Sequence, residues 1–400
     1  MASIRHMNET APPAEAARLN SEGMLALRAG NYAEAERLFV AATTHDTMSS
    51  ALWRNVATAR RAQGDDTGEM LALDAAISID RRDFMGWLRK AELHERTGEK
   101  AEALVAWSGV LQMAAHASDL SPDIAAALQR GQAFVSQATL QIADAVSTEL
   151  APLSAAMDET ELRRSKAFVD VALGRRRTYV NTCDGLYYPF LPADEFFDRH
   201  HFPWMPAIEA ATDEIRQELE ALLADPGDAL RPYVRMDSGV PENKWSALDR
   251  SLDWGACFLW EYGQPNKAVL DRCPRTAAAL ASLPTTTLPD RAPSAFFSIL
   301  KPHTRIPPHT GVTNTRAIVH LPLIVPEKCG FRVGGETREW KVGTAFAFDD
   351  TIEHEAWNDS EHYRAVLIFD VWNPHLTVAE QNVIARYYAA ADATGFKITH

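Results

Sequence analysis

Short apolar runs separated by turn residues dominate residues 294–374. The runs are 295–300, 316–321, 344–348 and 365–371, and Pro, Gly, Asp or Asn bounds each of them. Runs of this length with this punctuation are typical of strands in an all-β sandwich or barrel. The pattern therefore predicts a β-domain in the C-terminal half of the chain.

A small set of polar side chains interrupts or flanks these apolar runs. Its members are Ser298, His309, Arg316, His320, His354 and Arg364. A polar group that faces the interior of a small β-domain is costly without a partner, so inward-facing His and Arg indicate a bound metal or anion. We therefore expect the chemistry of the protein to lie within residues 294–374.

His309 and His354 are the candidate metal ligands. They lie 45 positions apart, and neutral imidazole suits Fe, Zn, Cu or Ni, so histidine alone does not identify the metal. Arg364 follows on the next apolar strand, and a buried arginine can bind a carboxylate through a bidentate, charge-assisted pair. The alternative from spacing alone is a loop histidine, a core histidine with satisfied hydrogen bonds and an ordinary ion-pair arginine.

A second periodicity marks the N-terminal part of the chain. Gly30, Gly64 and Gly98 lie 34 residues apart, and Trp53 and Trp87 keep the same step. This period is that of the tetratricopeptide helix–turn–helix unit, in which a Gly ends the first helix. The concave face of such a stack binds an extended peptide or a partner protein, so we expect a recruitment surface there.

The pattern divides the chain into four parts. They are residues 1–13, a leader that resembles an expression-vector remnant or a disordered N-terminus; 14–118, the tetratricopeptide repeats; 119–178, helices that cap and link; and 179–400, the β-domain. Further helices are expected at 122–150, 159–173 and 208–223 and after a capping box at Thr377. The predicted fold class is multidomain α plus β, a helical solenoid followed by the β-domain.

Composition narrows the class of protein. The net charge of −14 and the pI of about 5.4 argue against a general binder of nucleic acid or anionic membranes. No apolar run approaches the roughly 18 residues of a membrane span, and no signal peptide is visible. Cys183, Cys257, Cys273 and Cys329 are scattered; they fit reduced thiols in a cytoplasmic protein, with a disulfide as the alternative.

The local sequence words resemble one known family. The words are Pro308-His309-Thr310-Gly311, Thr313-Asn314, His320-Leu321, Phe348-Asp349-Asp350, Glu353-His354-Glu355-Ala356-Trp357, Arg364 and Asp370-Val371-Trp372-Asn373-Pro374. Over about 179–377 they run in the order found in the aspartyl/asparaginyl β-hydroxylase family. That family comprises Fe(II)- and 2-oxoglutarate-dependent dioxygenases on a double-stranded β-helix, so the resemblance implies this fold and this activity.

The resemblance also implies roles for single residues. His309 and His354 would bind iron, and together with Arg364 they form the expected catalytic set. Ser298 and Arg364 would hold the distal carboxylate of 2-oxoglutarate, with His320 beside this co-substrate and O2 as the oxidant. Most such oxygenases carry a carboxylate two residues after the first His, but the family resembled here lacks it, and this chain has Gly311.

The substrate is less defined than the reaction. In family members that hydroxylate Asp or Asn, two basic residues alternate on one strand face; here Arg316 is the expected substrate-binding residue, but Ile318 takes the second place. We expect hydroxylation of an Asp, Asn or other side chain in a peptide presented by the repeats. The alternatives are a small molecule or a lipid acyl chain, halogenation at the position without a carboxylate, and a non-catalytic repeat scaffold. Asp349 or Asp350 is either a substitute ligand or part of a turn.

Overall fold

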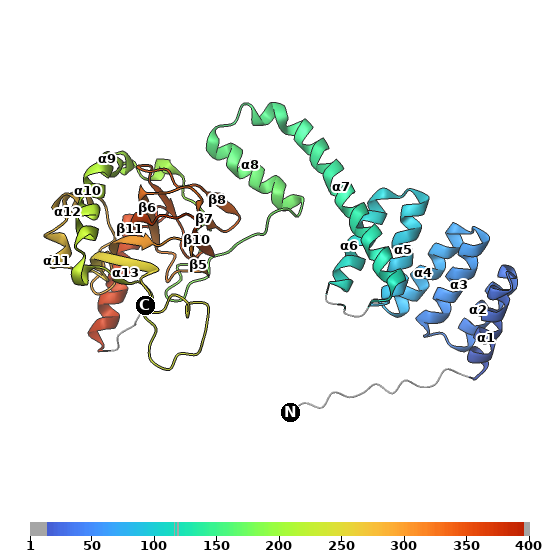
Figure 1. The fold of residues 1–400 in the computed structure, drawn as a ribbon. Helices are drawn as coiled ribbons and strands as arrows, with labels where there is room; N and C mark the ends of the chain where they lie inside the picture. The colour runs from blue at the N-terminus through green and yellow to red at the C-terminus, as the bar shows by residue number, and fades with distance from the viewer. Residues whose placement is uncertain (1–13, 116, 118–119, 396–400) are drawn as a thin grey trace. The chain divides into compact units, whose positions relative to one another are not determined.

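The computed structural model describes residues 14–115, 117 and 120–395. It divides into two compact units, Met1–Ala156 and Met157–His400, each with its own core (Figure 1). The boundary falls inside the stretch 119–178 that the sequence pattern assigns to linking helices. The predicted leader at 1–13 lies outside the described residues.

The first unit is built from consecutive helix pairs. Its helices are α1 (Ala14–Arg28), α2 (Tyr32–His45), α3 (Ser50–Gln63), α4 (Asp66–Ile79), α5 (Phe84–Thr97), α6 (Lys100–Ala114) and α7 (Pro122–Ser154). The helices α3 and α5 end at Gly64 and Gly98, whose φ angles of 77° and 78° favour glycine. The tetratricopeptide-like repeat predicted from the 34-residue period is confirmed.

Small residues allow these helices to pack closely. A Cβ atom at Gly23 of α1 would lie 2.7 Å from the ring of Phe39, which is fully buried on α2. Helix α7 begins at Ser121, whose side chain accepts a hydrogen bond from the Ile124 N–H, and it packs on α6. Among the described residues, no helix is both long enough and apolar enough to cross a membrane.

Helices also flank the β-structure of the second unit. They are α8 (Glu159–Ala172), α9 (Met205–Ala210), α10 (Thr212–Ala224), α11 (Lys267–Leu270), α12 (Pro274–Ala281) and α13 (Val378–Ala393), with single 3-10 turns at Arg199–His201 and Gly227–Ala229. The single helix expected at 208–223 is wrong: the chain forms two helices that meet at Ala211, where the Thr212 hydroxyl donates to the Glu209 carbonyl. The expected capping box between Thr377 and Glu380 is present at the start of α13.

Two antiparallel sheets form the body of the second unit. The larger sheet has the order β1-β2-β4-β11-β6-β9, with β3 beside β2, and the smaller has the order β5-β10-β7-β8. The strands are β1 (Arg231–Pro232), β2 (Trp254–Glu261), β3 (Gln264–Pro265), β4 (Ala295–Leu300), β5 (Thr304–His309), β6 (Arg316–Ile324), β7 (Cys329–Val333), β8 (Glu336–Arg338), β9 (Phe346–Phe348), β10 (His354–Asn358) and β11 (Arg364–Trp372). The predicted double-stranded β-helix class is confirmed.

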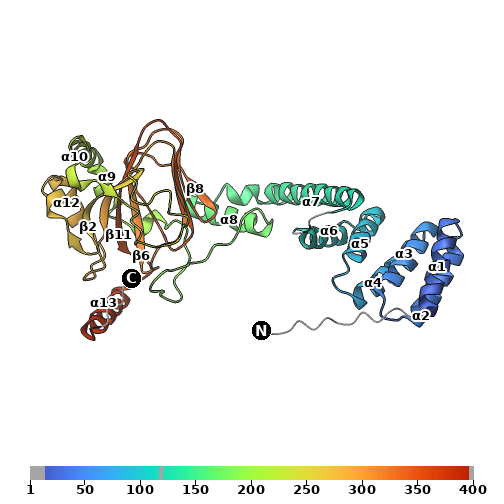
Figure 2. The ribbon, with the colours of Figure 1, turned by 60° about the horizontal axis from the view of Figure 1, so that its bottom comes forward.

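Each face of the larger sheet has a different role. Phe297, Val319 and Leu367 point to one face, where they pack with residues of α9, α10, α11 and α12 in one core cluster. Figure 2 shows α9, α10 and α12 on one side of the β-structure. Because successive side chains alternate between the faces of a strand, their sequence neighbours face the smaller sheet. Residues such as Leu300 and Phe331 from both sheets form the second core cluster there. The candidate site residues therefore lie between the two sheets.

Candidate active site

A cavity of about 380 Å³ opens between the two sheets. Every polar residue selected from the sequence lines it: Ser298, His309, Arg316, His320, His354 and Arg364. These residues come from five different strands, β4, β5, β6, β10 and β11. The structure thus brings the candidate residues together, while their individual chemical roles stay predictions.

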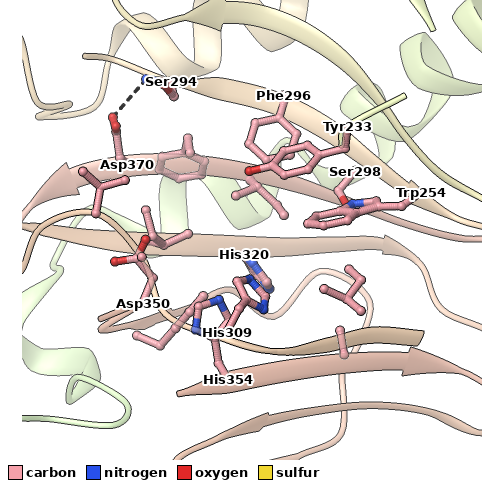
Figure 3. Close-up of a pocket in the computed structure, with 18 of the residues that line it drawn as sticks. Tyr233, Trp254, Ser294, Phe296, Ser298, His309, His320, Asp350, His354 and Asp370 are labelled. Carbon is pink, nitrogen blue, oxygen red and sulfur yellow. Dashed lines mark hydrogen bonds between the residues drawn. The ribbon is translucent and has the colours of Figure 1, made fainter. Parts of the chain in front are cut away.

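His309 and His354 lie side by side in this cavity. They are direct register partners on the antiparallel strands β5 and β10, and their ring centroids are 4.0 Å apart (Figure 3). The Nδ1 atom of His309 lies 2.8 Å from the Pro307 carbonyl oxygen, and that of His354 lies 3.0 Å from the Ile352 carbonyl oxygen. An Nδ1–H that donates to a carbonyl leaves the Nε2 lone pair available to a metal ion.

Burial keeps both imidazoles in the neutral form. It lowers the pKa of His309 to about 4, and it lowers the pKa of His354 well below the ordinary value, with the neighbouring His309 adding to the effect. A histidine must be deprotonated to bind a metal. The pair is therefore in its ligand form at neutral pH without the help of a metal.

Gly311 takes the position two residues after His309 where many oxygenases carry a carboxylate ligand, and the Asp350 carboxyl group fills the space beside it. A Cβ atom at Gly311 would lie 2.0 Å from a carboxyl oxygen of Asp350. Burial, and then the neighbouring Asp349, raise the pKa of Asp350 to about 7. Asp349 itself belongs to a turn, where it accepts hydrogen bonds from Thr351 and from Asn181. No group of three or more His, Cys, Asp or Glu residues among the described residues is arranged to hold a metal.

Arg364 brings an uncompensated positive charge into the cavity. Its guanidinium Nη1 donates to the Ser298 hydroxyl at 3.3 Å, and the group lies 4.5 Å from the centroid of the Trp340 ring. The residue is 1% exposed, its Nε has no hydrogen-bond partner within the described chain, and burial lowers its pKa to about 10. A buried cation without a counter-ion is costly, so this end of the cavity fits an anion such as a carboxylate.

His320 lines the same cavity as Arg364 and the histidine pair. It is buried, its ring centroid is 4.9 Å from that of Phe331, and its Nδ1 has no hydrogen-bond partner in the described part of the protein. Burial, followed by the charge of Arg364, lowers its pKa well below the ordinary value. A neutral imidazole with a free polar atom is suited to contact a co-substrate here.

Arg316 enters the cavity already paired. Its Nη1 lies 2.7 Å from a carboxyl oxygen of Asp370, a buried residue on the neighbouring strand β11 whose register partner is Ile318. Ile318, two positions along β6, lines the same cavity. The Arg316 guanidinium therefore has an acidic partner within the chain, and its contact with a substrate stays a prediction.

Several aromatic residues of the site are not predictable from the sequence pattern. The Trp254 indole N–H donates to the Ser298 hydroxyl at 3.1 Å, and Tyr233 stacks on Trp254 with ring centroids 3.9 Å apart (Figure 3). Trp245 approaches His309 edge-on, with ring centroids 5.0 Å apart. These residues belong to no recognised sequence word, and the only signal for them is a high local density of aromatic residues around positions 233–260.

Comparisons with known proteins agree with this geometry. A family model described as Aspartyl/Asparaginyl beta-hydroxylase matches residues 209–374. The human aspartyl/asparaginyl beta-hydroxylase is 36% identical over 179 residues, which cover 44% of this chain and 23% of that protein. The ornithine lipid ester-linked acyl 2-hydroxylase of Rhizobium tropici is 33% identical over 192 residues, which cover 47% of this chain and 64% of that protein. The chain thus spans about a quarter of the human relative and less than two thirds of the bacterial one.

Solved structures resemble the helical part. The Yersinia enterocolitica chaperone SycD with a YopD peptide has 19% identity and a TM-score of 0.29, and the match covers 31% of this chain and 92% of SycD. The Sgt2 TPR domain from Aspergillus fumigatus has 20% identity and a TM-score of 0.29, covering 33% and 87%. The repeat assignment rests on the chain's own helix pairs and 34-residue register. The chain therefore combines tetratricopeptide-like helical repeats with a C-terminal domain that matches the aspartyl/asparaginyl beta-hydroxylase family over residues 209–374.

Proposed function

We propose that the β-domain is an Fe(II)- and 2-oxoglutarate-dependent dioxygenase that hydroxylates an unactivated carbon. The observation that carries this proposal is the joint presence, in one cavity, of two neutral imidazoles in direct register and a buried arginine without a counter-ion. Imidazole ligands suit iron, and a buried guanidinium suits a carboxylate. A structural role alone does not account for an uncompensated cation in the protein interior.

The residues present fit both absent groups. His309 and His354 would hold Fe(II) through Nε2, because their Nδ1 atoms face backbone carbonyls. Arg364 and Ser298 would hold the distal carboxylate of 2-oxoglutarate. When bound, the iron and 2-oxoglutarate supply the oxidising chemistry, consuming O2 and releasing succinate and CO2.

The protein's own contribution is position, charge and exclusion of water. Trp254 fixes the Ser298 hydroxyl, and Trp340 covers the guanidinium of Arg364, so the expected carboxylate contacts are held before the co-substrate arrives. His309 and His354, both neutral, would leave the full charge of a bound Fe(II) uncompensated, and the 2-oxoglutarate dianion would balance it. Iron retention should therefore depend strongly on the co-substrate.

The proposed substrate is a side chain of a peptide or protein, of the Asp or Asn type or another kind, that the helical repeats recruit. Stacked helical repeats present an extended surface suited to such a ligand. The four free cysteines support a place for the protein in the reducing cytoplasm. A lipid acyl chain is the second candidate substrate, because the relative from Rhizobium tropici is named as an acyl hydroxylase.

Turnover of 2-oxoglutarate tests the proposal. Purified protein with Fe(II), O2 and 2-oxoglutarate should form succinate, even slowly and without substrate, and His309→Ala should abolish this. The matched control is His303→Ala, a histidine of the preceding loop whose side chain is 62% exposed and faces Glu361; it should leave succinate formation unchanged. If wild-type protein forms no succinate with any candidate substrate, the non-catalytic scaffold becomes the better account.

A further inference from the structure

The charged side chains that line the cavity are mostly carboxyl groups. Arg364 marks the end assigned to 2-oxoglutarate. The other charged side chains of the lining, apart from the histidines, are Glu261, Arg316, Asp350, Glu355 and Asp370. Apart from Arg364, the lining thus holds one cation and four carboxyl groups, and the pairing of these groups decides what the rest of the cavity can bind.

The single cation at the substrate end is neutralised. Arg316 donates to Asp370 at 2.7 Å; Asp370 is buried and the Arg316 side chain is partly buried. A second contact fixes Asp370, which accepts from the Ser294 N–H at 3.2 Å (Figure 3). Because Asp370 already balances the charge of Arg316, a second carboxylate here would have no unpaired cation to meet.

The arginines that pair with the remaining carboxyl groups lie outside the cavity lining, so they bring no further cation into it. Glu261 pairs with Arg231, and Glu355 pairs with Arg332, and both arginines lie outside the lining. Asp350 forms no ion pair with any residue in the described part of the chain. A substrate carboxylate would therefore meet carboxyl groups and a satisfied arginine.

Apolar and aromatic side chains form much of the remaining lining. Ile318 of β6 and Ile368 of β11 line it on the larger sheet, and both are partly buried against the core cluster between the sheets. Phe296 and Tyr233 continue the wall with ring centroids 5.3 Å apart, and Phe258 lies 5.0 Å from Phe296. Such a wall gains free energy by burying apolar surface and loses it by desolvating a charge.

Resting on the proposed function, we propose that the substrate group that enters this cavity is uncharged and largely hydrocarbon, and that Ile318 and the Arg316–Asp370 pair exclude a carboxylate such as an aspartate side chain. The specificity is that of an apolar side chain, a neutral amide or an acyl chain. Ile318 is the residue that disfavours a charged group. A cation at this position of β6 would face the same cavity and could pair with a carboxylate.

The polar remainder of the substrate has a place beside this cavity. A second cavity of about 490 Å³ shares Phe258, Glu261 and Tyr262 with the first. Gln264 and Asn266 line it and offer amide groups. Side-chain amides donate to and accept from backbone amides, so this cavity suits an amide-bearing segment attached to the apolar group.

An isosteric pair of probes tests the inference without the natural substrate. The protein is labelled with ¹³C in its isoleucine δ1 methyl groups, loaded with Zn(II) in place of Fe(II) and saturated with 2-oxoglutarate so that Arg364 is occupied. Propionamide should shift the Ile318 and Ile368 methyl signals saturably. Propionate, the same size but charged, should bind on the order of tenfold more weakly or worse. The methyl signal of Ile142, on α7 of the first unit, is the internal control.

Variants test whether Ile318 and the Arg316–Asp370 pair cause the preference for the uncharged probe. Ile318→Arg should reverse the preference at the Ile368 signal, and Ile318→Val should keep it. If Ile318→Arg fails to fold, Asp370→Asn gives the same reading, because it releases Arg316. Equal or tighter binding of propionate to the wild-type protein would overturn the inference, and so would the absence of any methyl shift with either probe.

A turnover experiment separates the two sources of an apolar group. Peptides with random flanks and Leu, Asn or Asp at one fixed position are compared with a neutral N-acyl amide, and mass spectrometry detects the gain of one oxygen atom. Gain on Leu, on Asn or on the acyl chain supports the inference and identifies the source, whereas gain on Asp at an equal rate contradicts it. The proposed function fails separately, through the absence of 2-oxoglutarate-dependent succinate formation.

Discussion

At the scale of single residues, Arg364 sets the character of the site. Its guanidinium is desolvated, has one hydrogen bond to Ser298 and keeps an unsatisfied Nε. The free energy that this arrangement costs in the empty protein is recovered only when an anion arrives. The unpaired charge of Arg364 therefore lowers the stability of the free protein and raises its affinity for the co-substrate.

Replacing Arg364 should therefore have two effects of opposite sign. Arg364→Met removes a buried, unpaired charge, so the free energy of unfolding of the metal-free protein should rise by on the order of 1 kcal/mol. The same change should weaken 2-oxoglutarate binding by about 2–5 kcal/mol, because a charge-assisted contact is lost. Urea unfolding and calorimetric titration measure the two quantities. Unchanged 2-oxoglutarate affinity in Arg364→Met would refute the role assigned to this residue.

Gly311 and Asp350 form a second pair whose effects should depend on each other. The Asp350 carboxyl occupies the space that a side chain at position 311 needs. Gly311→Ala should lower the free energy of unfolding by about 1–3 kcal/mol through overpacking. In the Asp350→Ala background the same change should cost less, with a coupling free energy of about 0.5–3 kcal/mol. Additive costs in urea unfolding of the metal-free protein would show that the two side chains do not compete for space.

At the scale of elements, the register of β5 and β10 creates the histidine pair. The strands place His309 opposite His354 although the two residues are far apart in sequence. Neither strand has a long apolar run, and β5 contains Pro307 and Pro308, so the hydrophobic pattern does not reveal them. The sequence words identify the two histidines, but the pairing that joins them is a long-range contact that no local pattern specifies.

The remaining elements show where local patterns suffice. The run 295–300 coincides with β4, and the runs at 316–321 and 365–371 lie within the longer β6 and β11, because strands buried on both faces read as continuous apolar segments. The helices of the first unit were predictable because the same 34-residue pattern recurs in each helix pair. Trp254, Tyr233 and Trp340 were not, because their roles arise from contacts between distant segments.

Helix packing in the repeat unit gives a test at this scale. A Cβ atom at Gly131 of α7 would lie 2.3 Å from the ring of Trp107, which is fully buried on α6. Gly131→Ala should therefore lower the free energy of unfolding of this unit by about 1–3 kcal/mol. Gly109→Ala is the matched control, since Gly109 lies on α6 and a methyl group there would have nothing within 4 Å; the change should be neutral or stabilising by up to about 1 kcal/mol. Equal effects of the two changes would contradict the close contact of α6 and α7.

At the scale of the whole molecule, the chain carries two compact units with separate cores. We expect two thermal transitions in scanning calorimetry. Phe39→Ala, which empties a fully buried position of the first unit, should lower one transition. Fe(II) with 2-oxoglutarate should raise only the other, because a ligand stabilises the unit that binds it. A single transition that responds to both changes would show that the units unfold together.

Anaerobic titration of the metal-free protein with Fe(II) and then 2-oxoglutarate tests the central claim most directly. We expect the weak visible charge-transfer band of an iron–2-oxoglutarate chelate in the wild-type protein. The band should be lost in His354→Ala and Arg364→Ala and kept in His303→Ala. If no band forms at any ratio of the three components, the two-histidine iron site is wrong.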